Sequence, residues 1–236
     1  MITKSMTTDE VLKEVQKIDD YVMRRTKGLL IKNKKKMESK AFKHNSILSS
    51  STYTVPETSD TVMVFAVKQT IELKGKEYAT MNLVYYIKTN YDTYIVPALN
   101  FHKCTVFRYV EFSCHSVDRM RERLGRDFDM FFREDYIKKN GSVFHPVKYD
   151  YNGDPDEFVA HIGSAFIFFE NEDLGKKHVV KTLLADEDLY CNQLVLKLDS
   201  KKKGESTLNE MYDFEKGFDT AHFKVLKRAG VIRTIA

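Results

Sequence analysis

The sequence predicts an α+β protein with a mostly antiparallel sheet, helices packed on one side of that sheet, and an N-terminal helical extension. Residues 52 to 112 form runs rich in β-branched and aromatic residues, which suit strands. Apolar residues recur at helical spacing near the N-terminus and again after residue 112. With 236 residues, 42% of them hydrophobic and 31% charged, the chain is long enough to bury a sizeable core.

The N-terminal fifth of the chain is expected to be a helix followed by a linker. Thr7-Thr-Asp-Glu10 is a capping-box sequence, which marks the start of a helix. Four apolar residues then recur at helical spacing: Val11, Val15, Ile18 and Val22. The serine-rich segment Ser46 to Thr52 follows a run of lysines and resembles a linker. We therefore divide the chain into a basic N-terminal helix and linker, 1–50, and an α+β domain, 51–236.

Strands and three further helices are expected in the larger domain. Lys74-Gly75-Lys76 is a hairpin turn signal between two strand-like runs. The expected strands are 61–73, 78–88, 93–99, 106–112, 157–169 and 177–185. A helix over residues 115 to 123 stops at Gly125, and a second one ends near Asn140-Gly141. Asn152 to Pro155 is a turn, and a last helix is expected around 208–226.

The helix after residue 112 carries a histidine and two arginines. His115, Arg119 and Arg123 lie four residues apart, so they fall within a stripe about 80° wide on the helix surface. An imidazole can accept and donate a proton near neutral pH, and a guanidinium matches phosphate oxygens bidentately. These side chains are suited to bind a phosphate and to move a proton beside it. If the substrate is RNA, its own 2′-OH can be the nucleophile. The alternative is a surface helix whose arginines are solvated or paired with Asp118 and Glu122.

A resemblance to known ribonucleases strengthens the first interpretation. Ser113 to Gly125 resembles the F-S-x-H-(x)3-R-M-(x)2-R-(L/I)-G segment of small metal-independent ribonuclease-toxin-like domains of the barnase, EndoU, colicin and RelE type. Residues 158–169 and 177–184 are similar to the closing strands of that group, in which a threonine approaches the site. The resemblance covers about 106–195, the expected nuclease-like core. It extends to uncharacterised proteins of phages and bacterial mobile elements.

The resemblance implies a metal-independent, toxin-like RNA endonuclease that works through attack of the 2′-OH and needs no cofactor. His115 would be the general base or acid, Arg119 and Arg123 would stabilise the developing charge, and Thr182 would assist. A second proton carrier stays open between His145 and His161. The alternatives are a non-catalytic structural protein of phage or mobile-element origin that binds nucleic acid or protein, and an inhibitor of a host defence enzyme.

The net charge of +4 is unevenly distributed. Residues 1–50 carry 12 Lys+Arg against 6 Asp+Glu, a net +6, so 26 against 28, a net −2, remain for residues 51–236. The basic residues that we expect to bind nucleic acid, RNA in the first instance, are Lys32, Lys34, Lys35 and Lys36. The other interpretation is a solvated linker. A protein partner, whether inhibitor, host factor or virion protein, is also open. Tyr85, Tyr86 and Tyr109 could stack on bases but are expected in the core.

Cysteine usage and hydropathy favour a cytoplasmic protein without a metal or a membrane span. Cys104, Cys114 and Cys191 are odd in number and far apart, as reduced thiols are. His102 and Cys104 could bind zinc together with Cys114 and His115, but that spacing is not a known zinc pattern. No apolar run reaches the roughly 18 residues that a membrane helix needs.

Overall fold

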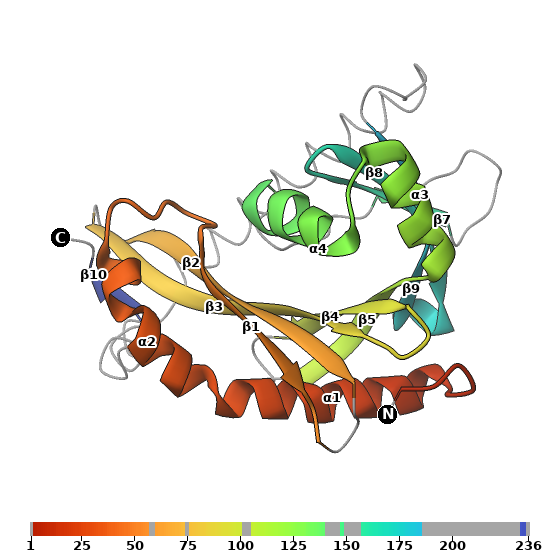
Figure 1. Ribbon diagram of the computed structural model, residues 1–236, viewed down its shortest axis with the longest axis horizontal. Coiled ribbons are helices and arrows are strands. Elements are labelled where there is room, and N and C mark those ends of the chain that lie inside the picture. Colours follow the sequence, from red (N-terminus) through yellow and green to blue (C-terminus); the bar gives the residue numbers. More distant parts are fainter. Residues whose placement is uncertain are drawn as a thin grey trace.

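The computed structural model describes residues 2–56, 60–73, 76–100, 105–139, 147–148, 157–185 and 232–234 (Figure 1). Its helices are α1 (Thr8–Arg24), α2 (Thr26–Glu38), α3 (Cys114–Leu124), α4 (Phe128–Phe131), the π-helix η1 (Phe132–Lys139) and the short 3-10 helix η2 (Asp173–Gly175). Its strands are β1 (Ile47–Thr54), β2 (Thr61–Leu73), β3 (Lys76–Lys88), β4 (Tyr94–Asn100), β5 (Thr105–Phe112), β6 (Val147–Lys148), β7 (Glu157–Ile162), β8 (Ala165–Glu172), β9 (Lys177–Ala185) and β10 (Ile232–Thr234).

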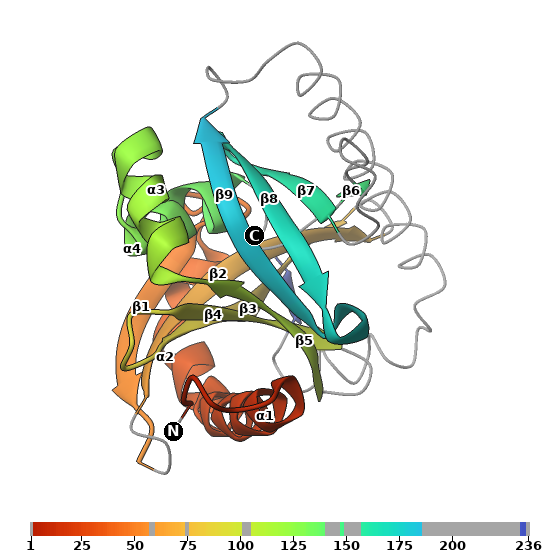
Figure 2. The ribbon, with the colours of Figure 1, turned by 90° about the vertical axis from the view of Figure 1, so that its right-hand side faces the viewer.

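The described strands form one sheet in the order β1-β2-β3-β4-β5-β9-β8-β7-β6, and β10 pairs with β3. Neighbours pair antiparallel except β5 and β9, which run parallel. Figure 2 shows β7, β8 and β9 turning sharply away from the first five strands. The predicted α+β class with a mostly antiparallel sheet is confirmed.

The N-terminal helices cover one face of the sheet and belong to its core. Val15 and Ile18 of α1 are fully buried in a cluster with side chains of β2, β3 and β4. The hydroxyl of Tyr85 on β3 donates to Oδ1 of Asp19 on α1 at 2.9 Å, in a buried position. Burial raises the pKa of Asp19, although this hydrogen bond opposes the change. The capping box at Thr7 is present. The predicted N-terminal helix is confirmed, and it packs on the sheet as a layer of the fold.

The opposite face is covered by α3, α4 and η1, so helices lie on both sides of the sheet (Figure 2). This second core is dominated by aromatic rings. Phe128 stacks on Tyr94 at 4.1 Å between centroids and meets Tyr86 edge-on at 5.0 Å. The three tyrosines considered for base stacking are buried, as expected of core residues: Tyr85, Tyr86 and Tyr109.

The segment expected as a linker is ordered secondary structure. The lysine run lies within α2, and the serine-rich segment forms β1, which pairs with β2 from Ile47 to Thr54. Leu48 of β1 is 2% exposed. The sequence pattern did not predict this strand because most of its side chains are small hydroxyl groups. Only one face of an edge strand needs apolar residues.

The second half of the sheet differs from expectation at one turn. The single strand expected over 157–169 is a hairpin, β7 and β8, which turns at Gly163 with φ +62°. A Cβ at Gly163 would lie 2.5 Å from Cβ of Asp135 on η1, so glycine is needed for space as well as for its backbone conformation. The turn at 152–155, the helix at 208–226, His145, and the zinc candidates His102 and Cys104 lie outside the described residues. No helix in the described part is long and apolar enough to cross a membrane.

Candidate functional site

The inner face of α2 is fixed to the sheet. Met37 is fully buried, and Nδ2 of Asn33 donates to Oγ of Ser49 on β1 at 2.8 Å. The ammonium of Lys36 donates to the carbonyl of Leu48, also on β1, at 2.6 Å. Lys36 therefore differs from the other lysines of its run, because its charge is engaged with the backbone of β1. The opposite side of α2 faces outward.

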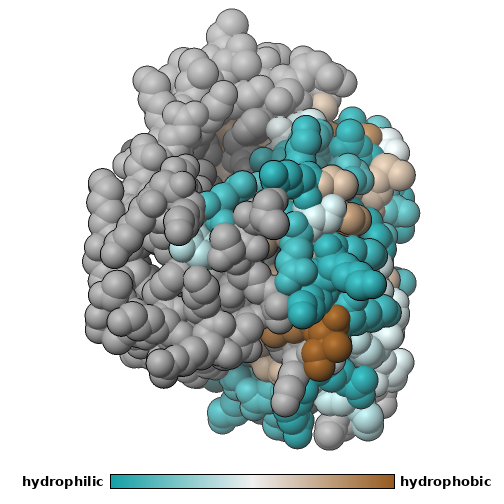
Figure 3. Space-filling view, turned by 90° about the vertical axis from the view of Figure 1, so that its left-hand side faces the viewer, coloured by the Kyte–Doolittle hydropathy of each residue, from teal (hydrophilic) through white to brown (hydrophobic). Residues whose placement is uncertain are grey.

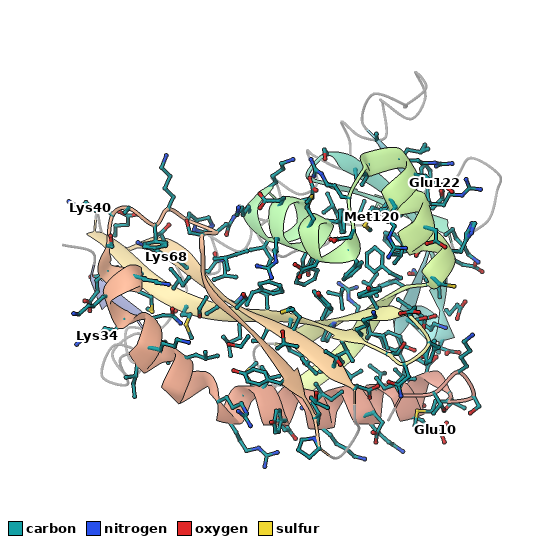
Figure 4. The ribbon with its side chains drawn as sticks, in the orientation of Figure 1. Glu10, Lys34, Lys40, Lys68, Met120 and Glu122 are labelled. Carbon is teal, nitrogen blue, oxygen red and sulfur yellow. The ribbon has the colours of Figure 1, made fainter. Side chains whose placement is uncertain are left out.

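The outward side of α2 and the segment after it concentrate positive charge. Residues 24–44 contain nine Lys and Arg against one acidic residue, Glu38, a net charge of +8. Lys36 is also exposed, but its ammonium is bonded to β1; the other exposed lysines of this region, called the basic face below, are Lys32, Lys34, Lys35, Lys40 and Lys43. Among the described residues, no ion pair links them to a carboxylate. Figure 4 shows Lys34 and Lys40 at the same end of the molecule.

A buried lysine holds the segment that follows α2. Lys68 of β2 is 1% exposed, and its ammonium donates to the carbonyl of Ser39 at 2.9 Å. Burial lowers the pKa of Lys68. The backbone N–H of Thr70 donates to Nδ1 of His44 at 3.0 Å. These contacts fix residues 39–44 against β2. Sequence reasoning missed Lys68, although a lysine that interrupts an otherwise apolar strand is a visible signal.

The α3 helix is present where the sequence predicts it. Oγ of Ser113 accepts from the backbone N–H of Ser116 at 3.3 Å, and Gly125 ends the helix in the left-handed conformation with φ +60°. Val117 and Met120 face the core, and His115 is exposed. The helical pattern therefore sorts apolar from polar side chains as expected.

The two arginines of α3 have different environments. Arg119 pairs with Glu122 at 2.9 Å, with 42% of the arginine side chain and 60% of the glutamate side chain exposed. Nη1 of Arg123 donates to Oγ1 of Thr182 at 3.1 Å and to the carbonyl of Leu183 at 2.6 Å. Arg123 and Thr182 are thus brought together, and Arg119 makes the alternative contact with Glu122 that the sequence left open.

Arg123 lies beside the part of β9 that β5 does not cover. The parallel pairing of β5 with β9 ends at Phe112 and Val180, and α3 starts two residues after Phe112. The helix therefore runs beside the rest of β9, and Arg123 supplies donors to it. His115 lies eight residues, or about 12 Å, away along the axis. While Arg123 holds Thr182, one phosphate does not reach both ends of this stripe.

A buried carboxylate near this end of β9 was not expected. Asp135 of η1 is fully buried and accepts from the ammonium of Lys139 at 2.9 Å and from the backbone N–H of Ser164 at 3.1 Å. It also pairs with Arg126. Burial alone would raise the pKa of Asp135, but Lys139, Arg126 and Ser164 outweigh it and hold the pKa below its usual value. This network ties η1 to the β7–β8 turn, which is a structural role.

One histidine is buried without a polar partner. His178 of β9 is 5% exposed, and neither ring nitrogen has a hydrogen-bond partner in the described structure. Its ring lies 5.2 Å from that of Phe169, edge to face. Burial, aided by the positive charge of Arg108, lowers the pKa of His178 to about 4. His178 is therefore neutral near physiological pH. Of the two residues considered as a second proton carrier, His161 lies on β7 and His145 lies outside the described residues.

Comparisons with protein families, with curated proteins and with solved structures find no match. Within the described residues, no group of three or more His, Cys, Asp or Glu side chains could hold a metal ion.

Proposed function

We propose that this protein binds nucleic acid through the basic face. The observation that carries the proposal is the group of five exposed lysines of the basic face, which lie on a fixed helix and an anchored loop within a segment, residues 24–44, of net charge +8. Lysines near a phosphate backbone release its condensed counterions, which provides affinity for nucleic acid of any sequence. Of the sequence-predicted binding residues, Lys32, Lys34 and Lys35 are exposed and suited to this role.

The same face fits a membrane surface less well. A helix that lies on a membrane inserts its apolar side into the bilayer. The apolar side of α2 is already packed on the sheet through Leu29 and Met37. A polyanion that needs only the exposed lysines suits this arrangement better.

The proposal is tested by point substitution. Deleting residues 1–50 would remove α1 and part of β1 from the fold, so it does not isolate the charge. We expect Lys32→Gln, Lys34→Gln and Lys35→Gln together to weaken binding of mixed-sequence nucleic acid at low salt by at least about a hundredfold, since each lysine contributes to counterion release. The measurement is fluorescence anisotropy with labelled RNA and DNA.

The control is a variant with the same change of charge at exposed lysines elsewhere: Lys13→Gln, Lys17→Gln and Lys138→Gln. It should bind like the wild type. If the two triple variants bind equally well, a nucleic-acid interface on α2 is wrong. Circular dichroism of both variants establishes that each is folded.

A second candidate function is cleavage of RNA at α3. It is supported by the position of α3 beside the strand that carries Thr182, as the ribonuclease resemblance implies, and by the exposure of His115 on this helix. In this mechanism His115 moves the proton of the 2′-OH or of the leaving oxygen, and Arg119 exchanges Glu122 for phosphate. An exposed ion pair is weak enough for that exchange.

The cleavage test uses purified protein, mixed-sequence RNA and a chelator. A 2′-OH mechanism leaves a 2′,3′-cyclic phosphate and spares DNA. His115→Ala should lower the rate by about 10²–10⁴, because it removes the proton carrier. Arg119→Lys should also lower it, because the bidentate fork is lost. If the wild type cleaves nothing, or if both variants cleave as fast as the wild type, nucleic-acid binding is the better explanation.

A further inference from the structure

The outward face of α2 has an apolar centre between lysines. Ile31 is 71% exposed, which is unusual for a large aliphatic side chain. At about 100° per residue, Lys34 projects about 60° to one side of Ile31, while Lys35 and Lys32 project about 40° and 100° to the other. Figure 3 views the end of the molecule where α2 lies, and its coloured atoms are mostly hydrophilic around a small hydrophobic cluster.

A glycine lies on the same outward face. Gly28 is about 60° from Ile31 on the helix and is exposed. A Cβ built there would meet nothing within 4 Å, and its φ is not positive. Neither packing nor backbone conformation in the described structure requires glycine at this position, where it destabilises a helix relative to alanine. Without a side chain at Gly28, the backbone of α2 is open on this side.

We propose that α2 binds in the major groove of B-form duplex DNA, an inference that rests on the proposed function and specifies its ligand. The groove is about 12 Å wide and admits a helix about 10–12 Å across. Lysines on both sides of α2 then reach the phosphates of both strands. Ile31 faces the base edges, where its side chain contacts thymine methyl groups, and Gly28 lets the helix approach the groove closely.

Other nucleic acids fit this face less well. The major groove of an RNA duplex is deep and narrow and does not admit a helix. Single strands are usually bound by stacking of bases on exposed aromatic rings. The tyrosines that the sequence offered for stacking, Tyr85, Tyr86 and Tyr109, are buried in the core. No aromatic residue occurs in α2 itself.

The experiment compares the affinities of the whole protein for three labelled probes of matching sequence at one salt concentration: duplex DNA, duplex RNA and single-stranded DNA. Duplex DNA should bind at least about tenfold more tightly than the other two, because only its groove accepts α2. A duplex with deoxyuridine in place of thymidine should bind several-fold more weakly, because it lacks the methyl groups that Ile31 contacts.

Two substitutions that keep the charge complete the test. Ile31→Ala should weaken binding to duplex DNA by about fivefold to tenfold and remove the preference for thymidine over deoxyuridine. Gly28→Ala should raise the melting temperature of the protein and yet weaken binding, because the added methyl group keeps α2 from the groove. A stabilised variant that binds less well is not explained by misfolding.

Equal or tighter binding of duplex RNA or of single strands would overturn the groove inference. So would unchanged affinity in both Ile31→Ala and Gly28→Ala. The triple lysine variant of α2 distinguishes a failure of the groove inference from a failure of the proposed function. If Lys32→Gln, Lys34→Gln and Lys35→Gln together weaken every probe, nucleic-acid binding stands and only the choice of duplex DNA is wrong.

Discussion

His178 shows how far a residue's environment can change its chemistry. Three other histidines drew attention as proton carriers, His115, His145 and His161, because of their neighbours in the sequence. His178 did not, because its burial depends on the pairing of β9 with β5 and β8 and on the ring of Phe169, which packs against it. A side chain that loses water without gaining a partner is visible only in the folded chain.

The burial of His178 predicts a loss of stability in acid. Its pKa is about 4 in the folded protein against 6.5 in the unfolded chain. The unfolded chain therefore takes up the proton first, and stability falls as the pH drops from about 6.5 toward 4. At pH 5 this contributes about 2 kcal/mol of lost stability relative to pH 7.5. Urea denaturation at the two pH values measures it.

The matched variant is His178→Leu, which cannot take up a proton. Carboxylates also titrate as the pH falls, but they do so in both proteins. The wild type should therefore lose about 2 kcal/mol more than the variant between pH 7.5 and pH 5. An identical loss in both would mean that His178 is hydrated or partnered in solution.

Elements with strong local signals were predictable. Strands β2 and β9 begin and end where the pattern indicates, and α3 begins and ends at its caps. Elements that are specified by contact with another part of the chain were not predictable. The β1 strand is specified by its pairing with β2, and the β7–β8 turn by the space that Asp135 leaves at Gly163. The π-helical turn of η1, which carries Asp135, has no marker in the sequence.

The position of α3 beside β9 predicts different effects for its two arginines. Arg123→Ala removes two hydrogen bonds from a charged group, one of them to a backbone carbonyl, and should lower the free energy of unfolding by about 1.5–3 kcal/mol. Arg119→Ala removes an exposed pair with Glu122 and should cost about 0.5 kcal/mol or less. Urea denaturation of both variants distinguishes them, and equal losses would mean that Arg123 does not hold α3 on β9.

In the whole molecule, the positive charge of the N-terminal segment lies on helices that form a layer of the fold. The net +6 of residues 1–50 was evident from the sequence, but its interpretation as an arm or linker missed that α1 and α2 form a layer of the fold. Helical wheels sort side chains by angle and do not say which face the sheet will cover. They also leave out the distance along the axis, which separates His115 from Arg123. The folded chain therefore favours α2 over α3 as the proposed functional surface.

The salt dependence of nucleic-acid binding is the sharpest test of whether the basic face is the interface. The slope of log Kobs against log salt concentration counts the phosphates that a protein neutralises, at about 0.9 per phosphate for duplex DNA. If the basic face is the interface, replacing Lys32, Lys34 and Lys35 by glutamine should make the slope shallower by about 2 to 3, while the control variant at Lys13, Lys17 and Lys138 keeps the wild-type slope. Equal slopes for the wild type and the α2 variant would contradict it.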